Sequence, residues 1–314
     1  MIVDNNAIFN LSNCLISAIN CSSVSEIQLL FGCRNYYYVQ KQLLPLLRKL
    51  GIISLCRFCR LDSNCIEIVF NCNRGKKYTF FYFNSNNKWI FRFQFHRSIE
   101  SDFSFCSKYK YDYFTFYTFN KPEDRYVRNL FHYTQRLSEY TNIPIPENIN
   151  LYIYNSQEQV IAMETNYGIT GIFEPLTDNI YVIGYEYIEH ELVHLFLSQL
   201  DGWPSQFVHE GMAGALSQQL ERVNSDENVR CKLLSFIYNK KTTYNTDEYI
   251  YCCLLFNYLF KTYGSEKVLQ LYRHDDGSYS DFLSLINKAF SCSVESILKT
   301  IFNDKQPFVW KKLF

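Results

Sequence analysis

The sequence predicts an α+β protein, in which stretches typical of helices and stretches typical of strands follow one another along the chain. Residues 1–50 are typical of helices, residues 52–97 alternate between apolar and polar side chains as strands do, and the chain after residue 221 is typical of helices again. The 314 residues are enough for two domains. We therefore expect an N-terminal α+β domain over residues 1–105 and a second domain over residues 106–314 that ends in helices.

The composition combines balanced charge with many aromatic side chains. Lys and Arg together number 31, as do Asp and Glu, so the chain has no overall field that would attract nucleic acid or an acidic membrane. The sequence does not open on a basic segment with an apolar run, and it lacks a run of about 18 apolar residues, so neither a signal peptide nor a transmembrane helix is expected. The 12 cysteines are scattered, which is typical of reduced thiols. These observations predict a cytoplasmic protein without membrane or nucleic-acid partners, and they leave its oligomeric state open.

The first 50 residues predict helices ahead of the strands. Residues 23–26 (Ser-Val-Ser-Glu) form a capping-box pattern, a Gly-containing turn follows, and a longer helix over residues 37–50 ends at Gly51. A short helix, a turn, a longer helix and a strand resemble a winged helix-turn-helix, in which the phosphate contacts would come from Arg34, Lys41, Arg48 and Lys49. However, Pro45 inside the longer helix costs roughly 3 kcal/mol or forces a kink. We therefore favour an ordinary helical hairpin packed on a sheet, with DNA binding as the alternative.

Four runs between residues 52 and 97 alternate in the manner of strands and are separated by turn residues: 52–60, 66–72, 78–83 and 89–96. Such short connections predict an antiparallel meander. Within it, Cys56 and Cys59 form a C-x-x-C pattern, with Cys65 and Cys72 following, so a structural zinc site is conceivable. An odd spacing along a strand sends two side chains to opposite faces, which argues against that site.

Residues 98–110 are polar and lack a period, and we place the domain boundary there. The stretches that follow predict strands at 113–119, 149–154 and 179–183, a turn with a short strand over 167–173, and helices at 122–140 and 156–165. After residue 221 the predicted helices are 227–239, 247–263, 265–273, 279–290 and 293–303.

The most informative stretch is residues 186–213, which contains H-E-x-x-H followed by H-E-G-M-A. In a helix, residues four apart lie one turn up and about 40° around from each other, so His190 and His194 lie side by side and can bind one metal ion. Glu191 lies on the same broad face, close enough to act on a water held by that ion. Apolar residues occupy the opposite face, so the helix is amphipathic. The alternative to a metal site is a half-exposed helix that carries two histidines by chance.

A second helix is expected to bring a further ligand to the two histidines. A glycine and a proline end the first helix, and the next begins near Ser205. The adjacent residues His209 and Glu210 point about 100° apart, so ordinarily only one of them reaches the metal. His209 falls within an apolar arc, whereas Glu210 lines up with Gly214 and Ser217, whose small side chains permit a close approach of the two helices. Glu210 is therefore the expected third ligand, and a three-histidine site is the alternative.

From about residue 113 to residue 303 the chain resembles the gluzincin zinc metallopeptidases of the peptidase MA-like family. The resemblance rests on the strand 150–154, a helix opened by Ser156, the glycines at 168 and 171, the strand 179–182, H-E-L-V-H at 190–194, F-V-H-E-G-M-A at 207–213 and the pattern that runs from Tyr249 to Lys267. That family has a glutamate in W-L-x-E-G-x-A as its third zinc ligand; Glu210 holds this position here, with Phe207 in place of Trp. The resemblance implies a zincin-like domain with a small mixed sheet, an active-site helix and a helical C-terminal subdomain. The first hundred residues fall outside it.

The resemblance also implies a zinc peptidase. His190, His194 and Glu210 would bind Zn²⁺, and Glu191 would take a proton from the attacking water and pass it to the leaving amine. The substrate would be a peptide or a protein, and endopeptidase and exopeptidase activity are both open. The alternative is a catalytically weak or inactive relative that acts as a regulator through an N-terminal domain that binds DNA or protein.

Three further expectations concern the site: two come from the same resemblance, and the pairing of the strand 179–183 comes from its place just before the metal-binding helix. Tyr249 occupies the place of a tyrosine that donates a hydrogen bond to the tetrahedral intermediate, with Tyr251 and Tyr244 as rivals. The strand 179–183 would pair with an extended peptide substrate. Gluzincins often have an acidic residue one turn after the third ligand, which orients a zinc-binding histidine. Gly214 stands at that position here, so another group fills the role or zinc is held less tightly.

Overall fold

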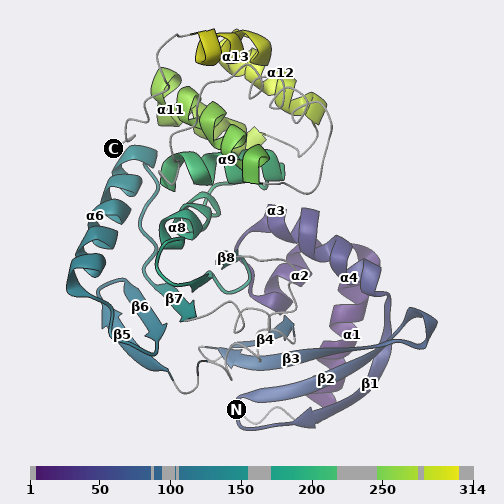
Figure 1. Cartoon of the computed structure of the whole chain (residues 1–314). Helices are drawn as coiled ribbons and strands as arrows, with labels where there is room; N and C mark the ends of the chain where they lie inside the picture. Colours follow the sequence, from purple (N-terminus) through teal and green to yellow (C-terminus); the bar gives the residue numbers. More distant parts are fainter. Residues whose placement is uncertain are drawn as a thin grey trace. The chain divides into compact units, whose positions relative to one another are not determined.

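The computed structural model describes residues 5–85, 88–93, 103, 106–154, 171–217, 246–274 and 279–303 (Figure 1). The chain divides into two compact units, one made of Met1–Lys121 with Ile149–Tyr185 and the other of Pro122–Asn148 with Glu186–Phe314. Both helices and sheets are present, so the α+β class is confirmed. The domain boundary expected between residues 105 and 106 lies inside the first unit and stays a prediction.

The first unit opens with the helices α1 (Asn5–Cys21), α2 (Val24–Phe31) and α3 (Tyr36–Tyr38), the π-helical segment η1 (Val39–Leu43) and α4 (Leu44–Leu50). Ser23 precedes α2 as expected, although its hydroxyl makes no capping bond. Gly32 and Gly51 follow α2 and α4 with φ angles of 64°, which glycine adopts without strain. Pro45 lies in the first turn of α4, directly after η1. Because proline has no N–H and crowds the preceding turn, the backbone widens to a π turn before it, which is the distortion that Pro45 predicts.

The strands β1 (Ile52–Arg60), β2 (Cys65–Cys72), β3 (Lys77–Ser85) and β4 (Lys88–Phe93) form an antiparallel sheet in chain order. The predicted meander is therefore confirmed. In the core of this part, Phe31 of α2 contacts the rings of Phe80 and Phe91, with centroids 6.0 and 5.8 Å away. Cys56 and Cys59 are exposed and free, and the described residues place no metal-binding group of three around them.

A second sheet in the first unit has the order β5-β6-β7-β9-β8. Its strands are β5 (Ser107–Tyr111), β6 (Phe114–Thr118), β7 (Ile149–Tyr154), β8 (Gly171–Glu174) and β9 (Asn179–Ile183). The strands β6, β7 and β9 are parallel, whereas the outer strands β5 and β8 are antiparallel to their neighbours, so the sheet is mixed.

Two expectations are corrected by this sheet. The stretch 98–110, interpreted as irregular, contains β5, whose lysines are exposed while Tyr109 and Tyr111 are half-buried. This alternation is only five residues long, and charged side chains are typical of an edge strand. The strand β9 is bonded to β7 on one side and to β8 on the other. The expectation that residues 179–183 pair with a peptide substrate is therefore wrong, because β9 has no unpaired edge; β8 is the outer strand.

A buried arginine joins the first sheet to the second within this unit. Arg92 of β4, which is 8% exposed, donates to the backbone carbonyls of Phe31 and Leu176. Leu176 lies in the turn between β8 and β9. Nearby in the sequence, Asp178 of the same turn pairs with Arg34, whose Nε lies 3.6 Å from the carboxylate. The turn of the second sheet is thus bonded to the N-terminal helices and to the first sheet.

The second unit is helical where it is described and contains α6 (Asp124–Thr141), α8 (Ile188–Leu197), α9 (Gln206–Ser217), α11 (Thr246–His274), α12 (Tyr279–Phe290) and α13 (Val294–Asn303). Gly264, with a φ of 80°, interrupts α11 between the two helices predicted at 247–263 and 265–273. The helices predicted at 156–165 and 227–239 lie outside the described residues. Among the described helices, none combines the length and the apolarity that a membrane crossing requires.

Candidate metal centre

The H-E-x-x-H segment forms α8, and its polar face is buried. The exposed fraction is 6% for His190, 6% for Glu191 and 5% for His194. The alternative of a half-exposed helix that merely carries two histidines is therefore contradicted. Burial of ionisable side chains costs free energy unless they bind one another or a ligand, so these three groups need partners.

One partner comes from α9, which packs against α8 (Figure 1). The Oε2 atom of Glu210 lies 3.2 Å from Nε2 of His190 and 3.6 Å from Nε2 of His194, and the two Nε2 atoms are 3.0 Å apart. In the described part of the chain, these three residues are the ones that could together hold a metal ion, because their ligand atoms all lie within 4.8 Å of one another. Two imidazole nitrogens and one carboxylate oxygen are a ligand set typical of catalytic zinc. The residues therefore fit a zinc ion.

The close approach shifts two pKa values in opposite directions. Burial raises the pKa of Glu210, but the charge of His194 and the hydrogen bonds from both histidines outweigh it, so this pKa is held well below its usual value. Burial lowers the pKa of His194, but the charge and hydrogen bond of Glu210 and the charge of Glu191 raise it above its usual value. The carboxylate and the imidazole thus each stabilise the charged form of the other. A metal ion supplies the same positive charge while both histidines stay neutral.

Two glycines let α9 and the chain before it approach α11 closely. Gly202 has a φ of 156°, and a Cβ built on it would lie 2.6 Å from the carbonyl oxygen of Tyr272. Within α9, a Cβ built on Gly211 would lie 2.4 Å from Cδ2 of Phe256. These distances are shorter than side-chain contacts allow, so only glycine permits the observed packing. Because Gly211 follows Glu210 directly, this packing also positions the third ligand.

His209, the rival third ligand, lies outside the group formed by the two histidines and Glu210. Its ring stacks on the ring of His194, with centroids 4.2 Å apart and planes at 25°. Its Nδ1 atom lies 3.3 Å from the hydroxyl oxygen of Tyr272, and the ring of Trp203 lies 5.0 Å away. Burial and the charge of His194 lower the pKa of His209 well below its usual value, so its ring is neutral. The arrangement is that of a side chain packed behind a ligand.

One contributor to the site has no local signal in the sequence. The hydroxyl of Tyr133, on α6, lies 3.3 Å from the carbonyl oxygens of Glu189 in α8 and of Leu216 in α9 and donates to them. Burial raises the pKa of Tyr133 far above its usual value, so the hydroxyl keeps its proton. It thereby ties together the two helices that carry the ligands. Tyr133 is separated in the chain from Glu189 by 56 positions and from Leu216 by 83, so no sequence motif could connect it with the site.

The structure describes some of the remaining predicted residues and not others. Glu191 is buried on α8 beside the ligands, and its charge acts on His194. Tyr249 lies in the first turn of α11, but its side chain and those of Tyr251 and Tyr244 are outside the described residues, so the tyrosine assignment stays a prediction.

In the part of the chain that the structure describes, one ligand histidine lacks a hydrogen bond at its second ring nitrogen. The Nδ1 atom of His194 is buried and has no hydrogen-bond partner among the described residues. Metal-binding histidines ordinarily donate this second nitrogen to a carboxylate or a carbonyl group. The orientation of the His194 ring must therefore be maintained by other means.

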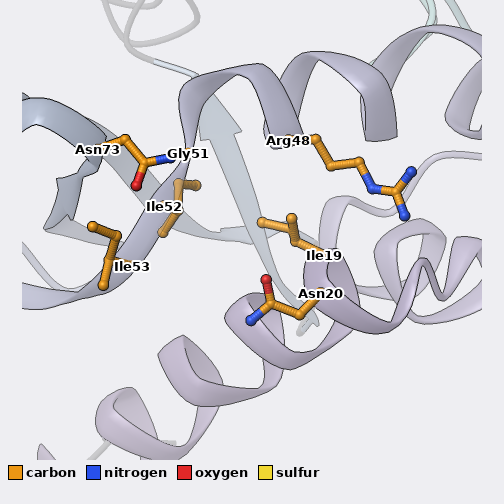
Figure 2. Close-up of a pocket in the computed structure, with 7 residues that line it drawn as sticks. All are labelled: Ile19, Asn20, Arg48, Gly51, Ile52, Ile53 and Asn73. Atoms are coloured by element: carbon orange, nitrogen blue, oxygen red, sulfur yellow. The ribbon is translucent and has the colours of Figure 1, made fainter.

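A separate pocket of about 400 Å³ lies in the first unit, where α1 and α4 end against β1 (Figure 2). It is lined by Ile19, Asn20, Arg48, Gly51, Ile52, Ile53 and Asn73. The guanidinium group of Arg48 donates to the hydroxyl of Ser22. The lining has no pair of side chains suited to acid–base catalysis or metal binding. Among the basic residues of the winged-helix interpretation, Arg34 pairs with Asp178 and Arg48 bonds to Ser22 within the protein.

Comparison with known proteins adds no family: no family model matches the sequence, and no curated protein matches it. The gluzincin resemblance therefore rests on the residues quoted for it and stays a prediction.

Proposed function

We propose that this chain is a zinc-dependent peptidase whose catalytic centre is formed by α8 and α9. The observation that carries the proposal is the convergence of His190, His194 and Glu210, with their ligand atoms 3.0–3.6 Å apart. The two helices bury the side chains of His190 and His194 and leave that of Glu210 26% exposed, although burial of such groups without a ligand is costly. A tightly bound cation offsets that cost, because it places a positive charge beside the Glu210 carboxylate and binds the lone pairs of the two imidazoles.

In this proposal His190, His194 and Glu210 hold the zinc ion. When bound at such a site, zinc acts as a Lewis acid and lowers the pKa of water to about 7. Glu191 is not one of the ligands but lies next to His190 on α8, and its carboxylate accepts the proton of the attacking water. The same carboxylate then returns the proton to the amine that leaves. Burial of Glu191 keeps bulk water from competing for that proton.

The substrate class is a peptide or a protein. This class follows from the resemblance to the gluzincins, and endopeptidase and exopeptidase activity both stay open.

The proposal is tested by zinc analysis and hydrolysis assays on the purified wild-type protein and on Glu191→Gln. We expect about one zinc ion per chain in both proteins, hydrolysis of a casein-type substrate by the wild type, and loss of that hydrolysis in the variant. Glu189→Gln, two residues earlier on α8 and about 200° around the helix from Glu191, is the matched control and should keep its activity. Wild-type turnover in Glu191→Gln would contradict the mechanism. A zinc-loaded wild type that hydrolyses no peptide would favour the inactive regulator instead.

A further inference from the structure

The ring of His194 is held in an unusual way for a metal ligand. Its Nε2 atom faces His190 and Glu210, whereas its Nδ1 atom is buried without a hydrogen-bond partner among the described residues. Rotation of the imidazole about its bond to Cβ would move Nε2 away from the other two ligand atoms. A hydrogen bond at the second nitrogen ordinarily prevents that rotation and contributes 10- to 100-fold, roughly, to metal affinity.

Two aromatic rings restrict the rotation of His194 instead. The ring of His209 lies over its face, with centroids 4.2 Å apart and planes at 25°. The ring of His190 meets it edge-on, with centroids 4.7 Å apart and planes at 86°. If the ring of His194 turned, its edge would run into the face of His209. Interiors are packed too densely for His209 to give way without a cost.

The ring of His209 is itself held in place by the second half of α11. Tyr272, whose residue is fully buried, shares a hydrogen bond with Nδ1 of His209 at 3.3 Å. The ring of Trp203, in the connection between α8 and α9, lies 5.0 Å from it at 51°. The close approach of Gly202 to the backbone of Tyr272 keeps this connection against α11. His209 is thus fixed from α11 and from the chain that enters α9.

We propose that His209 is a positioning residue that holds the His194 imidazole by ring stacking, in place of the hydrogen bond that Nδ1 lacks. The proposal rests on the metal site of the proposed function. It assigns a role to the first histidine of H-E-G-M-A that is distinct from metal ligation. The stacked face, and not the nitrogen atoms, is what His209 contributes.

Two substitutions separate stacking from mere filling of space. Zinc affinity is measured by competition with a chromophoric chelator for the wild type, His209→Ala and His209→Phe. The visible absorption of the cobalt-substituted protein reports the geometry of the ligands, and thermal unfolding of the metal-free protein reports its fold. We expect His209→Ala to bind zinc about 10-fold more weakly with an altered cobalt spectrum. His209→Phe keeps an aromatic ring over His194, so its affinity should stay within about threefold of the wild type. His132→Ala, on the exposed side of α6, is the control and should change nothing.

Each outcome decides between the interpretations. Unchanged zinc affinity and cobalt spectrum in His209→Ala would overturn the proposal, because the ring would then only fill space. Equal weakening in His209→Ala and His209→Phe would also overturn it, since the imidazole nitrogens would then be required. Should His209→Ala not fold, Tyr272→Phe takes its place: it removes the hydroxyl that anchors His209, and we expect zinc binding weakened by about threefold. Unchanged affinity in Tyr272→Phe would then count against the proposal. A wild type that binds no zinc refutes the proposed function itself, whereas tight zinc binding by both wild type and His209→Ala refutes only this inference.

Discussion

Replacement of Gly211 by alanine tests whether close packing of α9 on α11 positions the metal site. The added Cβ would lie 2.4 Å from Cδ2 and 2.8 Å from Cε2 of Phe256, and 3.2 Å from Cβ of Cys252. Ordinary contacts begin at 3.4 Å, so the phenylalanine ring or the whole helix must move by about 1 Å. Phe256 is fully buried, and the ring of Phe207 packs on it at 5.9 Å, so little room is available.

Two effects of opposite sign set the size of the change. Alanine is favoured over glycine inside a helix by about 1 kcal/mol. Overpacking of a dense core costs about 1–3 kcal/mol, and a contact this short with a fully buried ring belongs in the upper part of that range. We therefore expect Gly211→Ala to lower the free energy of unfolding by about 1–2 kcal/mol. Because Glu210 is the preceding residue, displacement of α9 should also weaken zinc binding.

The assay is urea unfolding of the metal-free protein, combined with a second substitution that makes room. In a Phe256→Leu background the added methyl group has space, so the cost of Gly211→Ala should shrink by at least about 1 kcal/mol. Zinc titration of the same four proteins reports the effect on the ligands. If Gly211→Ala stabilises the protein, and does so equally in both backgrounds, then helix propensity alone governs this position and the packing argument is wrong.

Three further substitutions test other parts of the structure. Glu210→Gln removes the anionic ligand and should weaken zinc binding by more than about 10-fold, and more than His209→Ala does; metal lost from the His209 variant but kept by Glu210→Gln would point to a three-histidine site. Arg92→Leu leaves the carbonyls of Phe31 and Leu176 buried without a donor, so we expect urea unfolding to show a loss of about 3 kcal/mol, and an unchanged midpoint would contradict the assigned role. Tyr249→Phe should lower kcat by roughly 10²–10³ if this tyrosine stabilises the oxyanion, and a change of only a few-fold would move the assignment to Tyr251 or Tyr244.

Features that depend on neighbours in the chain could be predicted from the sequence. The four strands of the first sheet follow from alternation and short turns, because each strand pairs with the next one along the chain. The distortion before Pro45 follows from the missing N–H of a single residue. The side-by-side placement of His190 and His194 follows from the helical repeat alone. These are local geometries, and they required no knowledge of the rest of the fold.

Other features depend on which distant segments meet, and those were decided by the tertiary structure. The sequence of α8 is amphipathic. Its polar face is nevertheless buried, because α9 packs against it with a carboxylate that the histidines can bind. The position of β9 in the sheet could not be predicted from its neighbours in the chain, because β8 pairs with one side of it and β7 with the other.

The supporting residues of the metal site show the same limit. Tyr272 lies 63 residues from His209, so neither spacing nor periodicity connects them. Helix periodicity could separate Glu210 from His209 by direction, because adjacent residues point about 100° apart. It could not show that the rejected histidine would stack on His194, since that contact exists only once α8, α9 and α11 have packed together.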